Sequence, residues 1–384
     1  MALPRRSAST AVVTCIKTAI FLAGALLLLA ALLPGCARHA PETWRAIEVP
    51  TDADFRGLWF TDSLHGWMTG GGAMVKGGII GRTDDGGRTW RFQSGIVPDA
   101  GAYFGLGRVQ MLDSLHGSVV GSGGTPLVTD DGGETWRRVP NGGAGDHPLL
   151  DVQFIDDRKG WAAGPSTVIR SEDAGETWEP IVYRMSARGA LSPRAIHFTD
   201  SNRGWLVSQL GILLRTDDGG HVWDQVPLPL APGEYPMLWD VTFSDARNGW
   251  IAGDGGTIFH TADGGATWSR QTNGVPIVRP THRGEPHRPR EVPPELGDQP
   301  DRLTVSAIQF VDANQGCAIG YYARAGESVI LGTADGGATW RVESVVPGET
   351  LHALFMLDAH HAWAAGDRRR TAPQVVMRYT RDER

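Results

Sequence analysis

Apolar residues in this protein fall in short runs that are rich in Val, Ile, Phe and Trp, and Gly-rich polar segments separate the runs. Residues 249–253 (Gly-Trp-Ile-Ala-Gly) and 257–260 (Thr-Ile-Phe-His) are two examples. Runs of this length and composition, broken by glycine, are typical of β-strands. Beyond the N-terminal segment the sequence shows no helical periodicity. The pattern therefore predicts an all-β protein.

An eight-residue motif, T-x-D-x-G-x-T-W, recurs along this strand-like sequence. Its six copies are Thr83–Trp90, Thr129–Trp136, Ser171–Trp178, Thr216–Trp223, Thr261–Trp268 and Thr333–Trp340. The tryptophans of successive copies lie 46, 42, 45, 45 and 72 residues apart. A period in the forties with strand-like sequence between is the signature of a β-propeller, in which small sheets are arranged radially.

We call each copy of this eight-residue motif a box. A second motif lies about 20 to 25 residues before each box: an aromatic residue or Met, any residue, Asp, three residues, and Gly-Trp. Clear copies begin at Phe60, Phe154, Phe198 and Phe243, and degenerate copies begin at Met111, Phe310 and Met356. The seven copies predict seven blades of four strands, A to D. Strand A ends at the aromatic residue, strand B starts at Gly-Trp, strand C enters the box, and strand D leaves it.

The two ends of the sequence each resemble half of a seventh box. The C-terminal segment opens like a box at Thr380 and Asp382, and Thr43-Trp44 near the start matches the second half. We therefore expect the N-terminal strand to complete the last blade, which closes the ring and leaves no dangling sheet. The fold prediction is a seven-bladed β-propeller over residues 41–384.

Residues 1–35 have a different character. Arg5, Arg6 and Lys17 precede an apolar run over residues 19–33, which is typical of a secretory signal peptide. The run is shorter than the roughly 20 residues that a membrane-spanning helix needs. Two alternatives to processing as a lipoprotein, which we predict below, are an uncleaved membrane anchor and ordinary signal-peptide cleavage.

The segment Leu33-Pro34-Gly35-Cys36 resembles the lipobox of bacterial lipoproteins. We therefore predict lipidation of Cys36, a short tether over residues 36–40, and anchoring in the membrane through the lipid. Because no Asp follows the cysteine, the expected location is the outer membrane, with the propeller facing the periplasm.

The charge balance limits the partners that the protein can bind. Its net charge is −7. Cleavage of the predicted signal peptide removes three basic residues and no acidic ones, so the mature protein carries more negative charge still. This argues against nucleic acid as a partner. The three cysteines, Cys15, Cys36 and Cys317, offer no disulfide framework. Cys317 stands where four sibling repeats have Trp, so we expect it in the core. We expect a monomer, and no cofactor or metal is implied.

The aspartates of the boxes look like candidate chemistry, yet six near-identical copies cannot share one active site. In such a turn the carboxylate can accept hydrogen bonds from the backbone, and each box has too few oxygen ligands for calcium. We therefore interpret them as structural. They are Asp85, Asp131, Asp173, Asp218, Asp263 and Asp335.

Length variation between the repeats falls in the B–C and D–A connections, whereas the regular motifs are A–B and C–D turns. In a four-stranded meander these two sets lie on opposite faces, so one face is scaffold and the other suits binding. The variable segments are 94–101, 140–147, 182–191, 227–235 and 271–301, and the last contains a long insert over 273–301.

Arginines and tyrosines gather in the long insert and in the sixth and seventh B–C loops of this face. The candidate partner-binding residues are Arg279, Arg283, Arg288, Arg290, Tyr321, Tyr322, Arg324, Arg368, Arg369 and Arg370. Because the last blade adjoins the sixth, their loops could converge. Clustered arginines beside tyrosines suit docking of an acidic protein segment or an anionic headgroup. The alternative is a Pro-rich flexible loop and a solvated run of charges.

The box and the second motif together, repeated over residues 41–384, resemble the BNR/Asp-box propellers of the photosystem II stability/assembly factor family. Members in photosynthetic organisms are lumenal, non-enzymatic helpers that bind reaction-centre proteins during assembly. The resemblance implies a non-enzymatic propeller that binds a membrane or envelope protein.

Two other functions stay open. The Asp box is shared with sialidases and other glycosidases, which need an arginine triad, a Tyr-Glu pair and an acid/base Asp. The segment Phe55-Arg56-Gly57-Leu58 only faintly resembles their Phe/Tyr-Arg-Ile-Pro motif, and no such set of residues is legible. The other alternative is a general envelope scaffold.

Overall fold

The computed structural model describes nine stretches of the protein. These are residues 43–72, 75–96, 105–124, 126–181, 184–185, 191–272, 274–276, 302–368 and 374–380. Thr43–Glu383 form one compact unit. The predicted signal peptide over 1–35, the tether with Cys36, and all of the insert 273–301 except 274–276 lie outside the described residues.

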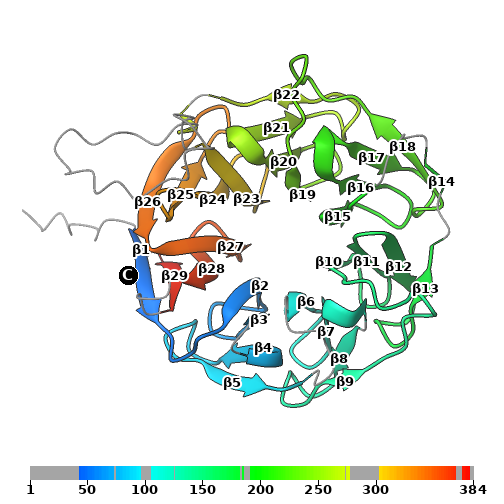
Figure 1. The fold of residues 1–384 in the computed structure, drawn as a ribbon, viewed down its shortest axis with the longest axis vertical. Helices are drawn as coiled ribbons and strands as arrows, with labels where there is room; N and C mark the ends of the chain where they lie inside the picture. The colour runs from blue at the N-terminus through cyan, green and yellow to red at the C-terminus, as the bar shows by residue number, and fades with distance from the viewer. Residues whose placement is uncertain are drawn as a thin grey trace, which may run out of the picture. The chain divides into compact units, whose positions relative to one another are not determined.

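Seven sheets are arranged in a ring around a central axis (Figure 1), and the four main strands of each are antiparallel. The first three blades are β2–β5 (Asp54–Phe60, Gly66–Gly72, Val75–Thr83, Arg91–Ser94), β6–β9 (Leu106–Met111, Gly117–Gly121, Leu127–Thr129, Arg137–Arg138) and β10–β13 (Asp151–Phe154, Gly160–Gly164, Thr167–Ser171, Glu179–Pro180). The next two are β15–β18 (Ala195–Phe198, Gly204–Val207, Leu213–Thr216, Val222–Val226) and β19–β22 (Leu238–Phe243, Gly249–Gly253, Thr257–Thr261, Ser269–Arg270). The sixth is β23–β26 (Leu303–Phe310, Gly316–Tyr322, Glu327–Thr333, Arg341–Pro347). The prediction of a seven-bladed propeller is confirmed.

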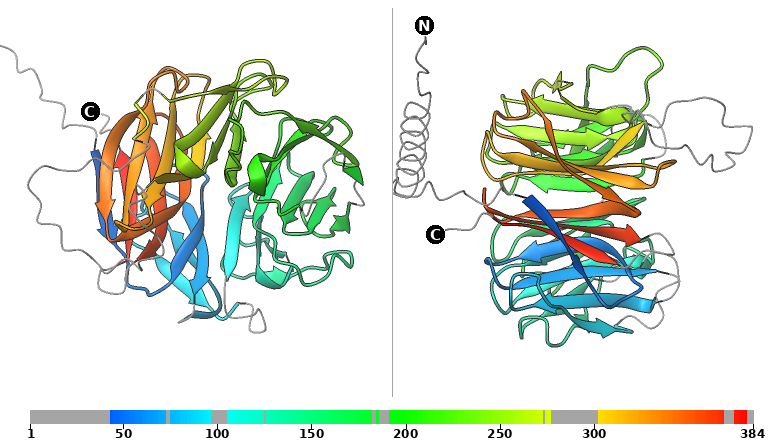
Figure 2. Two further views of the ribbon diagram at one scale, coloured as in Figure 1. Left: turned by 45° about the horizontal axis from the view of Figure 1, so that its top comes forward. Right: turned by 90° about the vertical axis from the view of Figure 1, so that its left-hand side faces the viewer.

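The seventh blade joins the two ends of the sequence. It consists of β27 (Glu349–Met356), β28 (His361–Arg368), β29 (Val375–Thr380) and β1 (Thr43–Glu48). Strand β1 pairs antiparallel with β29, from Thr43 opposite Thr380 to Glu48 opposite Val375. Figure 2 shows the blue N-terminal strand lying beside the red C-terminal strand. Closure of the ring by the N-terminal strand occurs as expected.

One strand is not anticipated by the sequence pattern. Strand β14 (Arg184–Met185) pairs in parallel with β18, so the fourth blade has five strands. It lies within the D–A connection 182–191, which the comparison of repeat lengths identifies only as variable. The extra strand covers part of the outer edge of this blade, a position at which an exposed edge strand would otherwise offer free backbone groups.

Aromatic pairs hold neighbouring blades together. The strand-B tryptophan of one blade stacks on the strand-A phenylalanine of the next, with ring centroids 3.5 to 4.0 Å apart. The pairs are Trp161–Phe198, Trp205–Phe243, Trp250–Phe310 and Trp363–Phe60. The indole Nε1 of Trp250 also donates to the carbonyl oxygen of Gly336 in the following box, at 2.9 Å. The second motif therefore encodes the contact between blades.

Two further observations concern the interior and the membrane. Cys317 is buried in the cluster between the sixth and seventh blades, where burial raises the pKa of its thiol, so its placement in the core is confirmed. In the part of the protein that the structure describes, no helix has the length and apolar character needed to span a bilayer.

Candidate functional site

The A–B and C–D turns form one face of the ring, which we call the repeat face. In all seven A–B turns the Asp of the second motif accepts hydrogen bonds from the backbone N–H groups two and three residues later. These residues are Asp62, Asp113, Asp156, Asp200, Asp245, Asp312 and Asp358. The same chemistry therefore recurs in every blade.

The six box aspartates also act within their own turns. Asp131 is representative: its Oδ1 accepts from Thr135 N at 2.9 Å and from Thr129 Oγ1 at 2.8 Å, and its Oδ2 accepts from Thr135 Oγ1. Hydrogen bonds that favour the carboxylate lower the pKa of Asp131 to about 2, although burial acts in the opposite direction. The two Oδ1 bonds recur at Asp85, Asp173, Asp218, Asp263 and Asp335, whereas Asp218 has no second hydroxyl to bind because Val222 replaces the threonine.

The B–C and D–A connections form the opposite face, which we call the variable face. Three of its B–C turns contain one short 3₁₀ turn each: η1 (Ser122–Gly124), η2 (Gln209–Gly211) and η3 (Asp254–Gly256). The turns share a backbone path but differ in side chains. The face therefore differs chemically from blade to blade.

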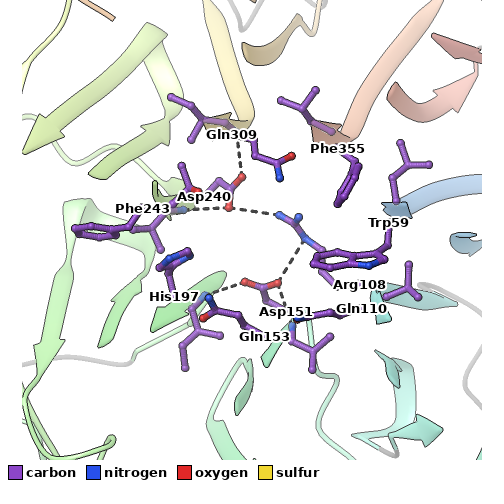
Figure 3. A pocket seen from close by; sticks show the side chains of 18 of the residues that line it. Trp59, Arg108, Gln110, Asp151, Gln153, His197, Asp240, Phe243, Gln309 and Phe355 are labelled. Atoms are coloured by element: carbon purple, nitrogen blue, oxygen red, sulfur yellow. Dashed lines mark hydrogen bonds and ion pairs between the residues drawn. The ribbon is translucent and has the colours of Figure 1, made fainter. Parts of the chain in front are cut away.

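The central channel is lined by the seven A strands and contains a cavity of about 260 Å³. The residue before each strand-A aromatic or Met faces this cavity. Gln110 and Gln153 each clamp the backbone of the next A strand: Gln110 Nε2 donates to Phe154 O at 3.0 Å, and Phe154 N donates to Gln110 Oε1 at 2.8 Å. The seven channel-facing residues are Trp59, Gln110, Gln153, His197, Thr242, Gln309 and Phe355, and all but Thr242 are labelled in Figure 3.

Three charged side chains meet across the channel. Arg108 reaches from the second blade between Asp151 of the third and Asp240 of the fifth (Figure 3). Its Nε lies 3.5 Å from Asp151 Oδ1, and its terminal nitrogen lies 3.4 Å from Asp240 Oδ1. The second oxygens of the two carboxylates accept from Ile196 N and Ile308 N. The set ties the second to sixth blades together and carries one negative charge when both carboxyls are ionised.

Burial shifts the protonation equilibria in the channel. It raises the pKa of Asp240 to about 6, against the opposing effect of Arg108, and it also raises the pKa of Asp151. Burial lowers the pKa of His197 to about 4, so this imidazole is neutral at neutral pH. The channel therefore holds an acid that titrates near neutrality. Among the described residues, no cluster of three or more His, Cys, Asp or Glu could hold a metal ion.

A row of polar side chains follows the rim of the channel on the variable face. Its first part spans the fourth to sixth blades. The guanidinium of Arg194 lies over the Trp239 ring, 4.9 Å from the centroid. Trp239 Nε1 donates to Asp254 Oδ1 at 2.8 Å, and Thr304 Oγ1 donates to the same oxygen at 3.1 Å.

The second part of the row continues to the first blade. The Tyr321 and His352 rings lie edge to face, with centroids 5.7 Å apart. His352 Nε2 is 3.0 Å from Asp367 Oδ2, which also accepts from the Arg56 guanidinium at 2.7 Å. Burial lowers the pKa of His352 and outweighs the neighbouring carboxylate. Arg56 and Arg108 are thus both bound to carboxylates of the protein itself.

The predicted partner-binding residues have different locations in the structure. Tyr321 lies in the rim row and Arg324 is half-buried in the β24–β25 turn. Tyr322 is 1% exposed and its hydroxyl donates to Pro276 O, so this side chain packs in the core between the fifth and sixth blades and is not a surface residue. Arg279, Arg283, Arg288, Arg290, Arg369 and Arg370 lie outside the described residues, and of Arg368 only the backbone is described.

Sequence reasoning missed six residues of the channel and the rim. A signal was present, because all six lie in or beside strand A or just after strand B, at positions where the repeats differ from one another. Comparing the repeats position by position identifies channel-facing residues. It does not say which of them meet, because their blades are not neighbours in sequence. The missed residues are Arg108, Asp151 and Asp240 in the channel, and Arg194, Trp239 and Asp254 on the rim.

Comparison with known proteins identifies relatives. The sequence profile described as photosynthesis system II assembly factor YCF48 matches residues 36–143 and 144–237, which together make up more than half of the sequence. The protein is also 40% identical over 73 residues to "Photosystem II stability/assembly factor HCF136, chloroplastic" of Cyanidioschyzon merolae. This match covers 18% of the protein and only 16% of the length of that relative.

Two solved structures share the architecture. The structure described as YCF48 bound to D1 peptide is 19% identical, with a TM-score of 0.64, over 88% of this protein and 97% of the other. The structure of YCF48 from Cyanidioschyzon merolae is 16% identical, with a TM-score of 0.62, over 88% of this protein and 98% of the other. At these identities the likeness concerns the fold, whereas the sequence profile concerns the family. The protein belongs to the family of the photosystem II assembly factor YCF48.

Proposed function

We propose that this protein is an exported, non-enzymatic propeller that binds a segment of a membrane or envelope protein on its variable face. The observation that carries the proposal is the contrast between the two faces. On the repeat face the aspartates of both motifs are used within their own turns. On the variable face an irregular row of Arg, Trp, Asp, Tyr and His follows the rim of the channel from the fourth blade to the first. A family relative has been solved with a bound peptide, which supports a protein ligand.

The cellular setting is part of the same proposal. Arg5, Arg6 and Lys17 before the apolar run support export, and the lipobox-like segment ending at Cys36 supports a lipid anchor. A lipidated monomer at the periplasmic face of the outer membrane would hold the propeller close to envelope proteins. The name of the relative's peptide does not extend to the client of this protein, which we define only by chemistry.

An enzymatic role is less well supported. A sialidase binds its substrate carboxylate with three arginines, but Arg56 and Arg108 are already paired with Asp367 and with Asp151 and Asp240. We expect no hydrolysis of a fluorogenic sialoside. Hydrolysis that is lost in Arg56→Ala would instead establish the glycosidase alternative.

The proposal is tested by blocking one face at a time. A cysteine introduced at exposed Asp146, in a D–A connection, or at exposed Ser114, in an A–B turn, is coupled to a long poly(ethylene glycol) polymer. Ser114 lies in the second blade and Asp146 in the connection from that blade to the third, so the two sites differ mainly in the face they occupy. Buried Cys317 should not react. The unmodified protein and both conjugates are then used to capture proteins from native host membranes.

We expect the polymer at Asp146 to abolish capture of a membrane protein and the polymer at Ser114 to leave it unchanged. Equal capture by both conjugates, or loss only with Ser114, would refute the assignment of the variable face. The triple change Arg368→Ala, Arg369→Ala and Arg370→Ala, at low and moderate salt, tests the arginine part of the prediction separately.

A further inference from the structure

Two exposed apolar side chains lie at the seam between the fourth and fifth blades on the variable face. Leu210 is 53% exposed and Tyr235 is 70% exposed. The residues that follow them in the sequence are hydrogen-bonded to each other: Gly211 N donates to Pro236 O at 2.6 Å. Leu238 N likewise donates to Ser208 O at 3.1 Å. The η2 turn and the following D–A connection therefore present these side chains from one fixed backbone unit.

The backbone at Leu210 is unfavourable for a leucine. Its φ is 62°, in the left-handed region. The equivalent positions of η1 and η3 are Gly123 (φ 77°) and Gly255 (φ 69°), and a Cβ at either would meet nothing within 4 Å. A non-glycine residue in this conformation carries a steric cost, because its Cβ crowds the following carbonyl oxygen. Burial does not offset that cost here, because half of the side chain stays in solvent.

The charge that accompanies this apolar pair is an arginine without a carboxylate partner. Arg194 N donates to Val207 O at 3.0 Å, which fixes its backbone beside the strand that leads into η2. Among the described residues, the Arg194 guanidinium has the Trp239 ring as its contact, no hydrogen bond or ion pair, and a buried Nε without an acceptor. Burial lowers the pKa of Arg194, against the effect of Asp254. A half-buried cation without an acceptor favours an anion brought by a ligand.

The nearby carboxylates are already occupied. Asp254 Oδ1 accepts from Trp239 and from Thr304. Glu234, next to Tyr235, accepts from the Arg270 guanidinium at 2.6 Å and from Ala231 N at 2.9 Å. Arg194 is therefore the charge at this seam that lacks compensation by a direct bond within the described part of the protein.

We propose that this seam is a docking site for an extended protein segment that carries a carboxylate next to an apolar side chain. The carboxylate pairs with Arg194 above Trp239, and the apolar side chain packs against Leu210 and Tyr235. The partner is an acidic-apolar peptide and not a lipid headgroup, because the site joins one cation to apolar surface and contains no cluster of cations among the residues that the structure describes. This inference rests on the proposed function and gives the client segment its chemistry.

The site is tested by photo-crosslinking in the full-length protein. The crosslinking amino acid p-benzoylphenylalanine replaces Tyr235 in one version and Leu64, an exposed residue of a repeat-face A–B turn, in the other. Both are irradiated in native host cells, and the crosslinked peptide is sequenced by mass spectrometry. We expect a crosslink from position 235 to one segment in which Asp, Glu or a terminal carboxylate stands beside an apolar residue, and none from position 64.

Matched variants then separate binding from folding, with the crosslinked segment made as a synthetic peptide. We expect Arg194→Gln to weaken its binding at least tenfold, and a carboxylate-to-amide change in the peptide to add little further loss, because both changes remove the same ion pair. Leu210→Gly should weaken binding several-fold while the melting temperature stays the same or rises. The repeat-face changes Leu115→Ala and Arg88→Gln should leave the affinity unchanged.

The result distinguishes this inference from the proposed function. A crosslinked segment without a carboxylate, or equal binding by Arg194→Gln, overturns the seam site even if the polymer at Asp146 blocks capture. Crosslinks that arise only from other positions of the variable face overturn it in the same way and leave the proposed function standing. If neither face crosslinks and neither polymer blocks capture, both proposals fail.

Discussion

The two faces of the ring use polar residues in opposite ways. On the repeat face, seven motif aspartates and six box aspartates each satisfy backbone N–H groups of their own turn. On the variable face, Arg194, Trp239, Asp254, His352 and Asp367 contact side chains from other turns or blades. The first kind of contact closes within a few residues and therefore repeats with the sequence. The second depends on the assembled ring.

The contrast separates residues that the fold requires in every blade from residues that it does not require. A box can be copied from blade to blade because its hydrogen bonds are local and every blade needs the same turn. The φ of 62° at Leu210 has no such folding reason, since η1 and η3 make the same turn with glycine. Residues that break the repeat at a cost in stability are therefore the ones to examine for function.

The largest expected effect is a difference in the free energy of unfolding between two tryptophan variants, one at a contact between blades and one on the rim of the channel. Trp250→Ala removes a fully buried ring that stacks on Phe310 and donates to Gly336 O, and should lower the free energy of unfolding by about 3–5 kcal/mol. Trp239→Ala, on the partly exposed rim, should lower it by less than about 1.5 kcal/mol. Urea denaturation measures both. Equal losses would remove the distinction between scaffold and binding surface.

The channel between the two faces should give the protein a pH-dependent stability. The pKa of Asp240 is raised to about 6, so between its unfolded value of 3.8 and about 6 the folded state binds more protons than the unfolded state. The free energy of unfolding therefore falls as pH rises through this window, by about 3 kcal/mol from this group. His197, with its pKa lowered from 6.5 to about 4, acts in the opposite direction and by a similar amount over most of the same window.

Asp240→Asn isolates the carboxyl contribution. Urea unfolding at about pH 4 and about pH 7 should show a drop in the wild type, relative to the variant, of about 2 kcal/mol. The exposed change Asp146→Asn should keep the wild-type profile. A variant profile parallel to the wild type would mean that Asp240 is not the titrating group.

A smaller effect is expected from a single box. Asp131→Ala leaves Thr135 N and two threonine hydroxyls without their acceptor in an exposed turn, and should lower the free energy of unfolding by about 1–2 kcal/mol. Asp146→Ala, on the variable face, should change it by less than about 0.5 kcal/mol. Binding of the client should respond to neither change. A loss of affinity in Asp131→Ala at temperatures where it is folded would contradict a structural role.

The smallest expected effect has the opposite sign. Leu210→Gly relieves the left-handed backbone and removes an exposed apolar side chain, so the melting temperature should stay level or rise, by the equivalent of about 0.5–1 kcal/mol. Differential scanning calorimetry measures the change. A clear decrease in melting temperature would show that Leu210 has a packing role instead of a binding role.

The sequence predicts the fold well because the repeat is local chemistry. The box and the second motif define the blade, and Thr43-Trp44 with Thr380 indicate how the ring closes. Strand β14 is not predicted because it is short and pairs in parallel with β18, which comes later in the sequence after three intervening strands and a 3₁₀ turn. Tyr322, a predicted partner-binding residue, is instead the last residue of β24, and its side chain is buried.

The candidate site is less predictable for a geometrical reason. Arg108, Asp151 and Asp240 come from the second, third and fifth blades and meet only across the channel. Arg194 and Leu210 belong to the fourth blade, whereas Trp239 and Tyr235 belong to the first strand of the fifth blade and the connection that precedes it. The repeat period predicts that these positions lie along the central channel or on its rim. Which side chains touch depends on bulges and loop lengths that the repeat does not specify.

Hydrogen–deuterium exchange of the full-length protein, with and without its captured membrane client, tests the central claim most directly. The account predicts slower exchange in the variable-face segments around residues 191–194, 208–212 and 231–239, and unchanged exchange in the A–B and C–D turns. Slower exchange confined to the Asp-box turns would contradict it, because the client would then bind the face that we assign to the scaffold.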